Sequence, residues 1–159
     1  MTDPYKSCTL CPRMCHADRT VTTGFCGCND KITAARAALH PWEEPCISGN
    51  RGSGTIFFTG CTLKCVFCQN YTLSHENFGI EISAERLAEI FLELQEKGAH
   101  NISLVTATQY LPSIREALNI VRPQLSIPVV YNSGGYERIE TLREYADCID
   151  IYLPDLKYY

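Results

Sequence analysis

The chain has 159 residues, which predicts a single domain, and 45% of them are hydrophobic. Its net charge of −4 gives no general attraction to nucleic acid or anionic lipid, and no apolar run is long enough to span a bilayer. The first residues, MTDPYKSC, lack the apolar core of a signal peptide. We therefore expect a soluble cytoplasmic protein that binds neither nucleic acid nor membrane.

The cysteine content is unusual for such a protein, because the chain carries 10 cysteines. The cytosol keeps thiols reduced, so a disulfide framework is not expected. Metal or iron–sulfur ligation, together with some buried thiols, is the interpretation that fits a reducing compartment.

Residues 1–52 form a cysteine-rich segment with six of the ten cysteines and no regular hydrophobic period. Proline and glycine interrupt it, which predicts turns and loops, with one short helix around residues 32–39. We place a domain boundary here, so that residues 53–159 form the N-terminal part of a separate core.

The core alternates between strand and helix patterns. Strands are predicted at 54–59, 102–105, 127–131 and 149–153, where short apolar runs meet turn residues. A helix is predicted after Ser83, because Leu87, Phe91 and Leu94 share one helical face and Gly98 closes the segment. Further helices are expected at 111–125 and around Ile139 and Leu142.

This alternation predicts an α/β fold with a parallel sheet and right-handed crossovers. Reactive groups in such sheets lie at the carboxyl ends of the strands. Four segments should meet there: the cysteine loop 61–68 and residues 106–109, 132–134 and 155–157. No helix pattern follows the fourth strand, so we expect that the chain is incomplete or that its last edge is covered by something else.

Three cysteines follow the first predicted strand of the core in the spacing C-x3-C-x2-C: Cys61, Cys65 and Cys68. Three thiolates can hold three irons of a 4Fe–4S cluster and leave the fourth iron open to another ligand. The alternatives are a zinc site that takes its fourth ligand from elsewhere and three unligated thiols.

In this context the sequence resembles the radical S-adenosylmethionine superfamily, in particular its pyruvate formate-lyase activating enzyme-like branch. The stretches that carry the resemblance are CTLCPRMC, HPWEEPCISGNRGSGTIFFTGCTLKCVFCQN, VVYNSGGYE and DIYLPDLKYY. The resemblance implies a partial, truncated (β/α) barrel, a cluster held by the three cysteines and reductive cleavage of S-adenosylmethionine to a 5′-deoxyadenosyl radical. It also implies an electron donor such as flavodoxin or ferredoxin, and a protein substrate that receives a glycyl radical.

The resemblance also suggests which polar residues contact S-adenosylmethionine. Many superfamily members carry Gly-Gly-Glu after the second strand, where this chain has Thr-Ala-Thr-Gln and lacks the carboxylate. The cofactor contacts that we expect are Thr106, Thr108, Asn132, Ser133, Asp155 and Lys157. For the last two, the alternative is a solvated surface pair. No catalytic side chain is predicted.

A second cysteine group in the N-terminal segment has the spacing of a metal site. Cys8, Cys11, Cys15 and Cys26 could hold a structural zinc or an auxiliary iron–sulfur cluster, or remain free thiols. Of the other three cysteines, the one at 28 is spare, and those at 46 and 148 are expected to be buried. The stretch HPWEEP at 40–45 is expected to form a turn or to help dock a substrate. An incomplete barrel leaves a second function open: a metal- or cluster-binding module without catalysis.

Overall fold

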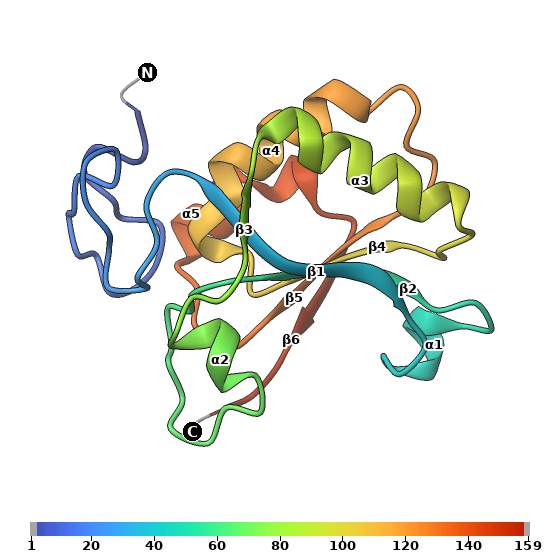
Figure 1. Cartoon of the computed structure of the whole chain (residues 1–159), viewed down its shortest axis with the longest axis horizontal. Helices are drawn as coiled ribbons and strands as arrows, with labels where there is room; N and C mark the ends of the chain where they lie inside the picture. The colour runs from blue at the N-terminus through green and yellow to red at the C-terminus, as the bar shows by residue number, and fades with distance from the viewer. Residues whose placement is uncertain (1–2, 158–159) are drawn as a thin grey trace.

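The computed structural model describes residues 3–157. Its elements are β1 (Ile32–His40), α1 (Pro45–Ser48), β2 (Ser53–Phe58), α2 (Tyr71–Ser74), β3 (Ile80–Ile82), α3 (Ala84–Glu96), β4 (Ile102–Val105), α4 (Leu111–Val121), β5 (Val129–Ser133), α5 (Ile139–Glu144) and β6 (Ile151–Pro154) (Figure 1). Short 3-10 turns follow β4 and α5. Within the described residues, no helix is long and apolar enough to cross a membrane.

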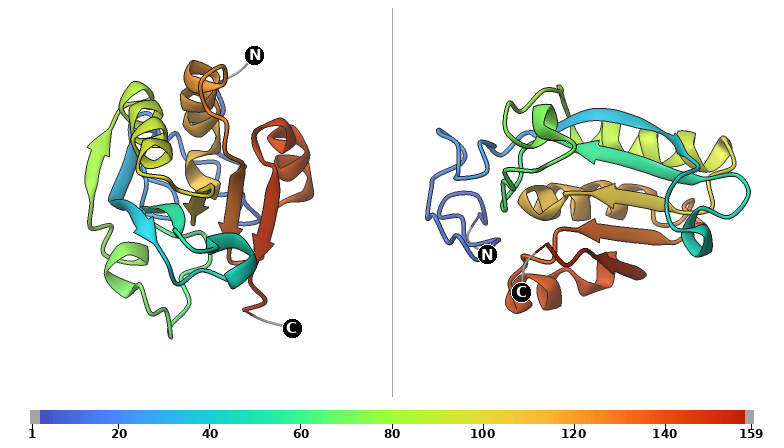
Figure 2. Two further views of the ribbon diagram at one scale, coloured as in Figure 1. Left: turned by 90° about the vertical axis from the view of Figure 1, so that its right-hand side faces the viewer. Right: turned by 90° about the horizontal axis from the view of Figure 1, so that it is seen from below.

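The six strands form one mixed sheet in the order β3-β1-β2-β4-β5-β6. The last four run parallel, as the βα pattern predicted, whereas β1 pairs antiparallel with both β2 and β3. Helices α3 and α4 lie side by side against the sheet (Figure 2). Their apolar faces and the central strands form the core, and Ile56, Phe91 and Leu104 are fully buried within it. Closure of the sheet into a barrel stays a prediction.

The two long helices begin and end where their sequences dictate. Ser83 caps α3 by accepting a hydrogen bond from the backbone N–H of Arg86, and Gly98 after its end has φ +86°. Helix α4 ends four residues earlier than predicted, at Val121. Arg122 still has helical angles, but Pro123 ends the helix because it has no backbone N–H to donate to the carbonyl four residues earlier and its ring crowds that carbonyl.

The helix predicted around residues 32–39 is wrong, since this segment is strand β1. Its alanines favour a helix locally, but pairing with a strand on each side outweighs that preference. The short strand β3, which completes the pairing, was not predicted. The sheet therefore takes one of its strands from the cysteine-rich segment.

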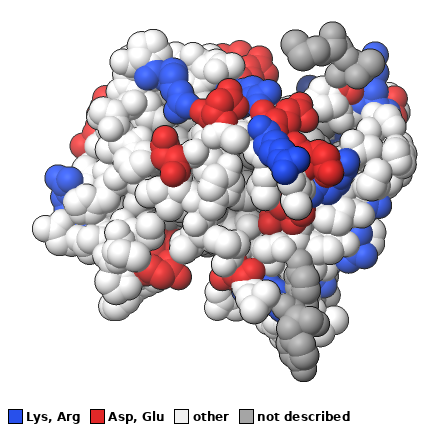
Figure 3. Space-filling model, turned by 180° about the vertical axis from the view of Figure 1, so that it is seen from behind, with Lys and Arg blue, Asp and Glu red and all other residues white. Residues whose placement is uncertain are grey.

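Residues 3–31 contain no helix or strand and fold through turns. Backbone hydrogen bonds from Cys8 to Ala17, from Arg19 to Tyr5 and from Asp30 to Arg19 hold them together. They lie beyond the end of the sheet at which β2 and β4 finish (Figure 1). On the opposite side of the molecule from that view, basic and acidic side chains are interspersed (Figure 3).

Candidate cofactor and metal site

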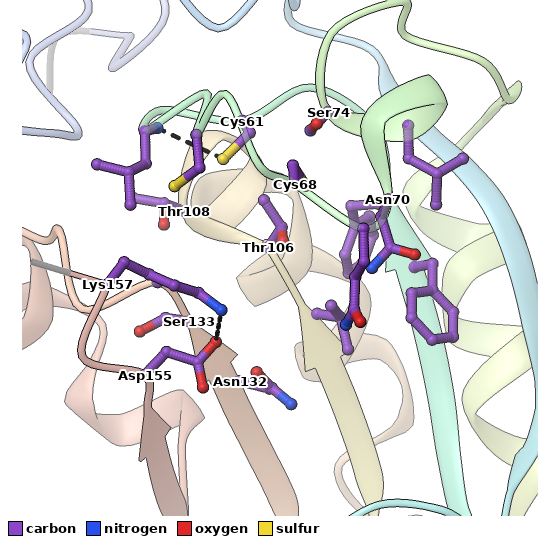
Figure 4. Close-up of a pocket in the computed structure, with 18 of the residues that line it drawn as sticks. Cys61, Cys68, Asn70, Ser74, Thr106, Thr108, Asn132, Ser133, Asp155 and Lys157 are labelled. Atoms are coloured by element: carbon purple, nitrogen blue, oxygen red, sulfur yellow. Dashed lines mark hydrogen bonds and ion pairs between the residues drawn. The ribbon is translucent and has the colours of Figure 1, made fainter.

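A cavity of about 510 Å³ lies at the carboxyl ends of the parallel strands. All four segments that the sequence analysis placed at this edge line it, together with residues of the turn after β1. Every predicted cluster and cofactor residue is among the lining side chains: Cys61, Cys65, Cys68, Thr106, Thr108, Asn132, Ser133, Asp155 and Lys157 (Figure 4). The structure therefore brings both predicted sets to one site.

The cysteine loop leaves β2 through Gly60, whose φ of +75° belongs to the left-handed region. The Cys61 sulfur accepts a hydrogen bond from the Leu63 N–H at 3.4 Å, and the Cys68 N–H donates to the Cys65 carbonyl at 3.1 Å. Burial raises the pKa of the Cys61 thiol. All three thiols are partly buried and remain accessible from the cavity.

Among residues 3–157, no three cysteine, histidine or carboxylate side chains converge as the ligands of a single ion would. A 4Fe–4S cluster differs from a single ion because each thiolate binds a different iron. Three thiols on one short loop, facing an open cavity, therefore fit a cluster with one iron free of protein ligands. They do not fit a single zinc ion as they stand.

The ends of the other parallel strands supply polar groups. Thr106 has φ +58°, which is strained for a β-branched residue, and its N–H donates to the Asn132 carbonyl at 3.1 Å. After β6, Lys157 pairs with Asp155 at 2.6 Å, and this pair faces the cavity (Figure 4). The strained threonine at this edge is the kind of local distortion that recurs at functional sites.

Three carboxylates in the cavity, Glu43, Glu44 and Glu137, were not predicted as site residues, and two of them accept hydrogen bonds from its polar side chains. Glu137 accepts hydrogen bonds from Ser133 at 3.1 Å and from Thr108 at 3.3 Å, and burial raises its pKa. Glu43 accepts one from Asn132 at 3.2 Å, and burial raises its pKa too. Both lie within stretches that carry the family resemblance, VVYNSGGYE and HPWEEP, which was the available signal. Neither forms an ion pair with a lysine or arginine in the described part of the chain.

Gln109, in the stretch expected to contact the cofactor, turns away from the cavity. Its side-chain amide is buried and lies 2.9, 3.1 and 2.8 Å from the carbonyls of Thr59, Gly60 and Thr106. It therefore joins the end of β2, where the cysteine loop begins, to the end of β4.

The second predicted cysteine group also gathers in space. Cys8, Cys11 and Cys26 are buried and Cys15 is exposed. Burial raises the pKa of the Cys11 thiol, and the three neighbouring thiols raise it further. The remaining cysteines divide: the one at 148 is buried as predicted, whereas the burial expected at 46 is wrong, since that side chain is exposed.

Comparisons with known proteins agree with this geometry. The family model of the radical SAM superfamily matches residues 55–159. An uncharacterized protein of Methanocaldococcus jannaschii is 31% identical over 163 residues, covering 97% of this chain and 46% of the relative. The chain thus spans about half the length of the curated relative that it matches. No solved structure matches it.

Proposed function

The chain belongs to the radical SAM superfamily, and we propose that it binds a 4Fe–4S cluster through Cys61, Cys65 and Cys68 and cleaves S-adenosylmethionine. One observation carries the proposal: these three thiols and the polar ends of the other three parallel strands line the same cavity. When bound, such a cluster supplies one electron for the reductive cleavage of S-adenosylmethionine to methionine and a 5′-deoxyadenosyl radical. The chain's own residues bind, orient and shield the reactants.

The charge of the cavity suits S-adenosylmethionine, which carries a sulfonium and an ammonium group. Four carboxylates, Glu43, Glu44, Glu137 and Asp155, line the cavity, and burial raises the pKa of two of them, Glu43 and Glu137, which have no ion-pair partner in the described part of the chain. These two can compensate positive charge on a ligand, which relieves the cost of burying them. Lys157 is the cation in the lining that can receive the ligand's carboxylate. Thr106, Thr108, Asn132 and Ser133 supply neutral hydrogen-bonding groups around these charges.

The finer assignments remain predictions from the sequence motifs. They are the pyruvate formate-lyase activating enzyme-like branch, a protein substrate that receives a glycyl radical, an external electron donor such as flavodoxin or ferredoxin, and a cytoplasmic location. A fold shared by many enzymes does not fix the substrate.

Electron paramagnetic resonance tests the proposal. The protein is reconstituted with iron and sulfide without oxygen, reduced, and measured before and after S-adenosylmethionine is added. We expect a 4Fe–4S signal that changes when the cofactor binds. An unchanged signal would favour the alternative, a cluster-binding module that does not seat S-adenosylmethionine by itself. The absence of any cluster signal would contradict both the catalytic function and a cluster-binding module, and would leave a module that binds a metal without forming a cluster.

A further inference from the structure

Arg19 is a cation fully buried in the N-terminal segment, with 0% of its surface exposed. Its guanidinium donates to the carbonyls of Cys28 at 3.0 Å, Gln109 at 2.8 Å and Asn29. It also lies 4.8 Å from the centre of the Tyr5 ring. No carboxylate within residues 3–157 forms an ion pair with it. The guanidinium thus has hydrogen-bond acceptors but no carboxylate to balance its positive charge. Burying an unpaired charge raises the free energy of the folded state.

Among the groups around Arg19, the thiols are those that lose their protons to a bound metal. The guanidinium lies 3.7 Å from the Cys8 sulfur. The sulfurs of Cys15 and Cys26 both lie within 3.6 Å of the position that a Cβ on Gly24 would take, so these two thiols approach each other over a glycine. Cys11 belongs to the same group, because the thiols of Cys8, Cys15 and Cys26 lie near enough to raise its pKa.

We propose that Cys8, Cys11, Cys15 and Cys26 form a second metal centre, for zinc or an auxiliary iron–sulfur cluster, whose negative charge Arg19 balances. Thiolates are the ligands that both kinds of centre prefer, and the four thiols release their protons when the metal binds. Within residues 3–157 no three of these thiols converge as the ligands of a single ion would, so a zinc ion requires their side chains to move together, which the exposed Cys15 can do by turning toward the three buried ones. A cluster asks for less convergence, because each thiolate binds a different iron. Arg19 would lie outside the ring of ligands, where it balances the negative charge of the thiolates and helps to orient them.

The neighbouring Cys28 has a different role in this arrangement. Its thiol donates to the Thr59 carbonyl at 3.4 Å, at the end of β2, and packs where Gly60 has no side chain. Together with the bond from Arg19 to Gln109, this contact joins the N-terminal segment to the start of the cysteine loop. The second centre would therefore hold in place the backbone that precedes Cys61.

The test uses a variant without the first set of thiols: Cys61→Ala, Cys65→Ala and Cys68→Ala together. It is loaded without oxygen, with zinc in one sample and with iron and sulfide in another, and its bound metal and sulfide are measured. We expect about one zinc, or one cluster with its sulfide, per chain. Adding Cys8→Ser and Cys11→Ser should abolish that binding. The proposal would be overturned if the triple alanine variant bound no metal, or if adding Cys8→Ser and Cys11→Ser left its metal binding unchanged.

A measurement without further mutation covers the case in which the serine variant does not fold. Cys15 and Cys46 are both exposed, so both should react with an alkylating reagent in the metal-free protein. Loading should protect Cys15 at least tenfold and leave Cys46 unchanged, as mass spectrometry of the alkylated peptides would report. Equal reaction of the two in the loaded protein would refute the second centre. Neither result depends on the cluster at Cys61, so the two proposals can fail separately.

Discussion

The hydroxyl of Ser133 donates a hydrogen bond to the carboxylate of Glu137 at 3.1 Å, across the loop that follows β5. Thr108, from the end of the neighbouring strand, donates to the other carboxylate oxygen and lies 2.7 Å from the Tyr131 hydroxyl. Two strand ends therefore hold one carboxylate at the cavity. Because burial raises the pKa of Glu137, its charged form lacks full compensation in the protein without ligand.

Replacing Glu137 with glutamine should stabilise the protein at neutral pH. The raised pKa means that the folded state binds this proton more tightly than the unfolded state, so ionised Glu137 opposes folding. We expect a gain in the free energy of unfolding of about 0.5 kcal/mol near pH 7, small because the group is partly solvated. The gain should shrink as the pH falls through the folded pKa, where the wild-type side chain becomes neutral.

Urea unfolding of both proteins across that range checks this prediction. Glu140→Gln is the matched control, since Glu140 is exposed on α5 and its own backbone lowers its pKa. The control should show no gain at neutral pH. A stability difference for Glu137→Gln that grows toward acid pH would contradict the assignment of an uncompensated carboxylate.

Removal of one cysteine of the loop should abolish the cluster that we propose. Cys61→Ala leaves two thiols on that loop, which are too few to keep three irons ligated. Whatever the second cysteine group holds, the reconstituted variant should lose the iron bound at this loop and the low-temperature paramagnetic signal that changes with S-adenosylmethionine. Cys46→Ala, an exposed thiol outside both groups, should keep them. If Cys61→Ala kept the iron content and the signal of the wild-type protein, the assignment of Cys61 as a ligand would be contradicted.

The backbone pattern of the core could be predicted because it is local. Ser83, the apolar face of α3 and Gly98 predicted that helix, and the four parallel strands follow from short apolar runs. Strand β1 could not be predicted in this way, because nothing local in its alanines indicates the strand that pairs on each side.

The residues of the site could also be predicted only where their placement follows from local sequence. The strand ends place the predicted residues at the cavity because parallel strands bring their carboxyl ends to one edge. The partners of Arg19 and of Gln109 lie up to ninety residues away in the chain, so no local pattern reveals them. Glu137 was missed because its role depends on burial, which a sequence motif does not show.

Gln109 should matter for the backbone around the cysteine loop more than for ligand contact. Gln109→Glu would place a carboxylate against three carbonyl oxygens and should destabilise the fold by about 3 kcal/mol or more. Gln109→Met keeps the length without a charge and should cost about 2 kcal/mol through unsatisfied carbonyls. Chemical denaturation of both variants gives the comparison, and equal stability of the two would contradict the contacts described for this amide.

We expect that replacing Gly60, the turn residue at the start of the cysteine loop, with any residue that has a side chain destabilises the protein. Its φ is +75°, and a Cβ there would lie 2.1 Å from the Cys28 sulfur and 2.8 Å from the Cys26 carbonyl. Gly60→Ala should therefore cost about 2 kcal/mol or more of unfolding free energy and shift the start of the cysteine loop, lowering the iron retained after reconstitution. Gly134→Ala is the matched control in the same cavity. Its Cβ would meet only the end of the Leu63 side chain, at 3.3 Å, and its φ needs no glycine. Equal iron retention and stability in the two variants would show that the N-terminal segment does not constrain the loop that carries Cys61.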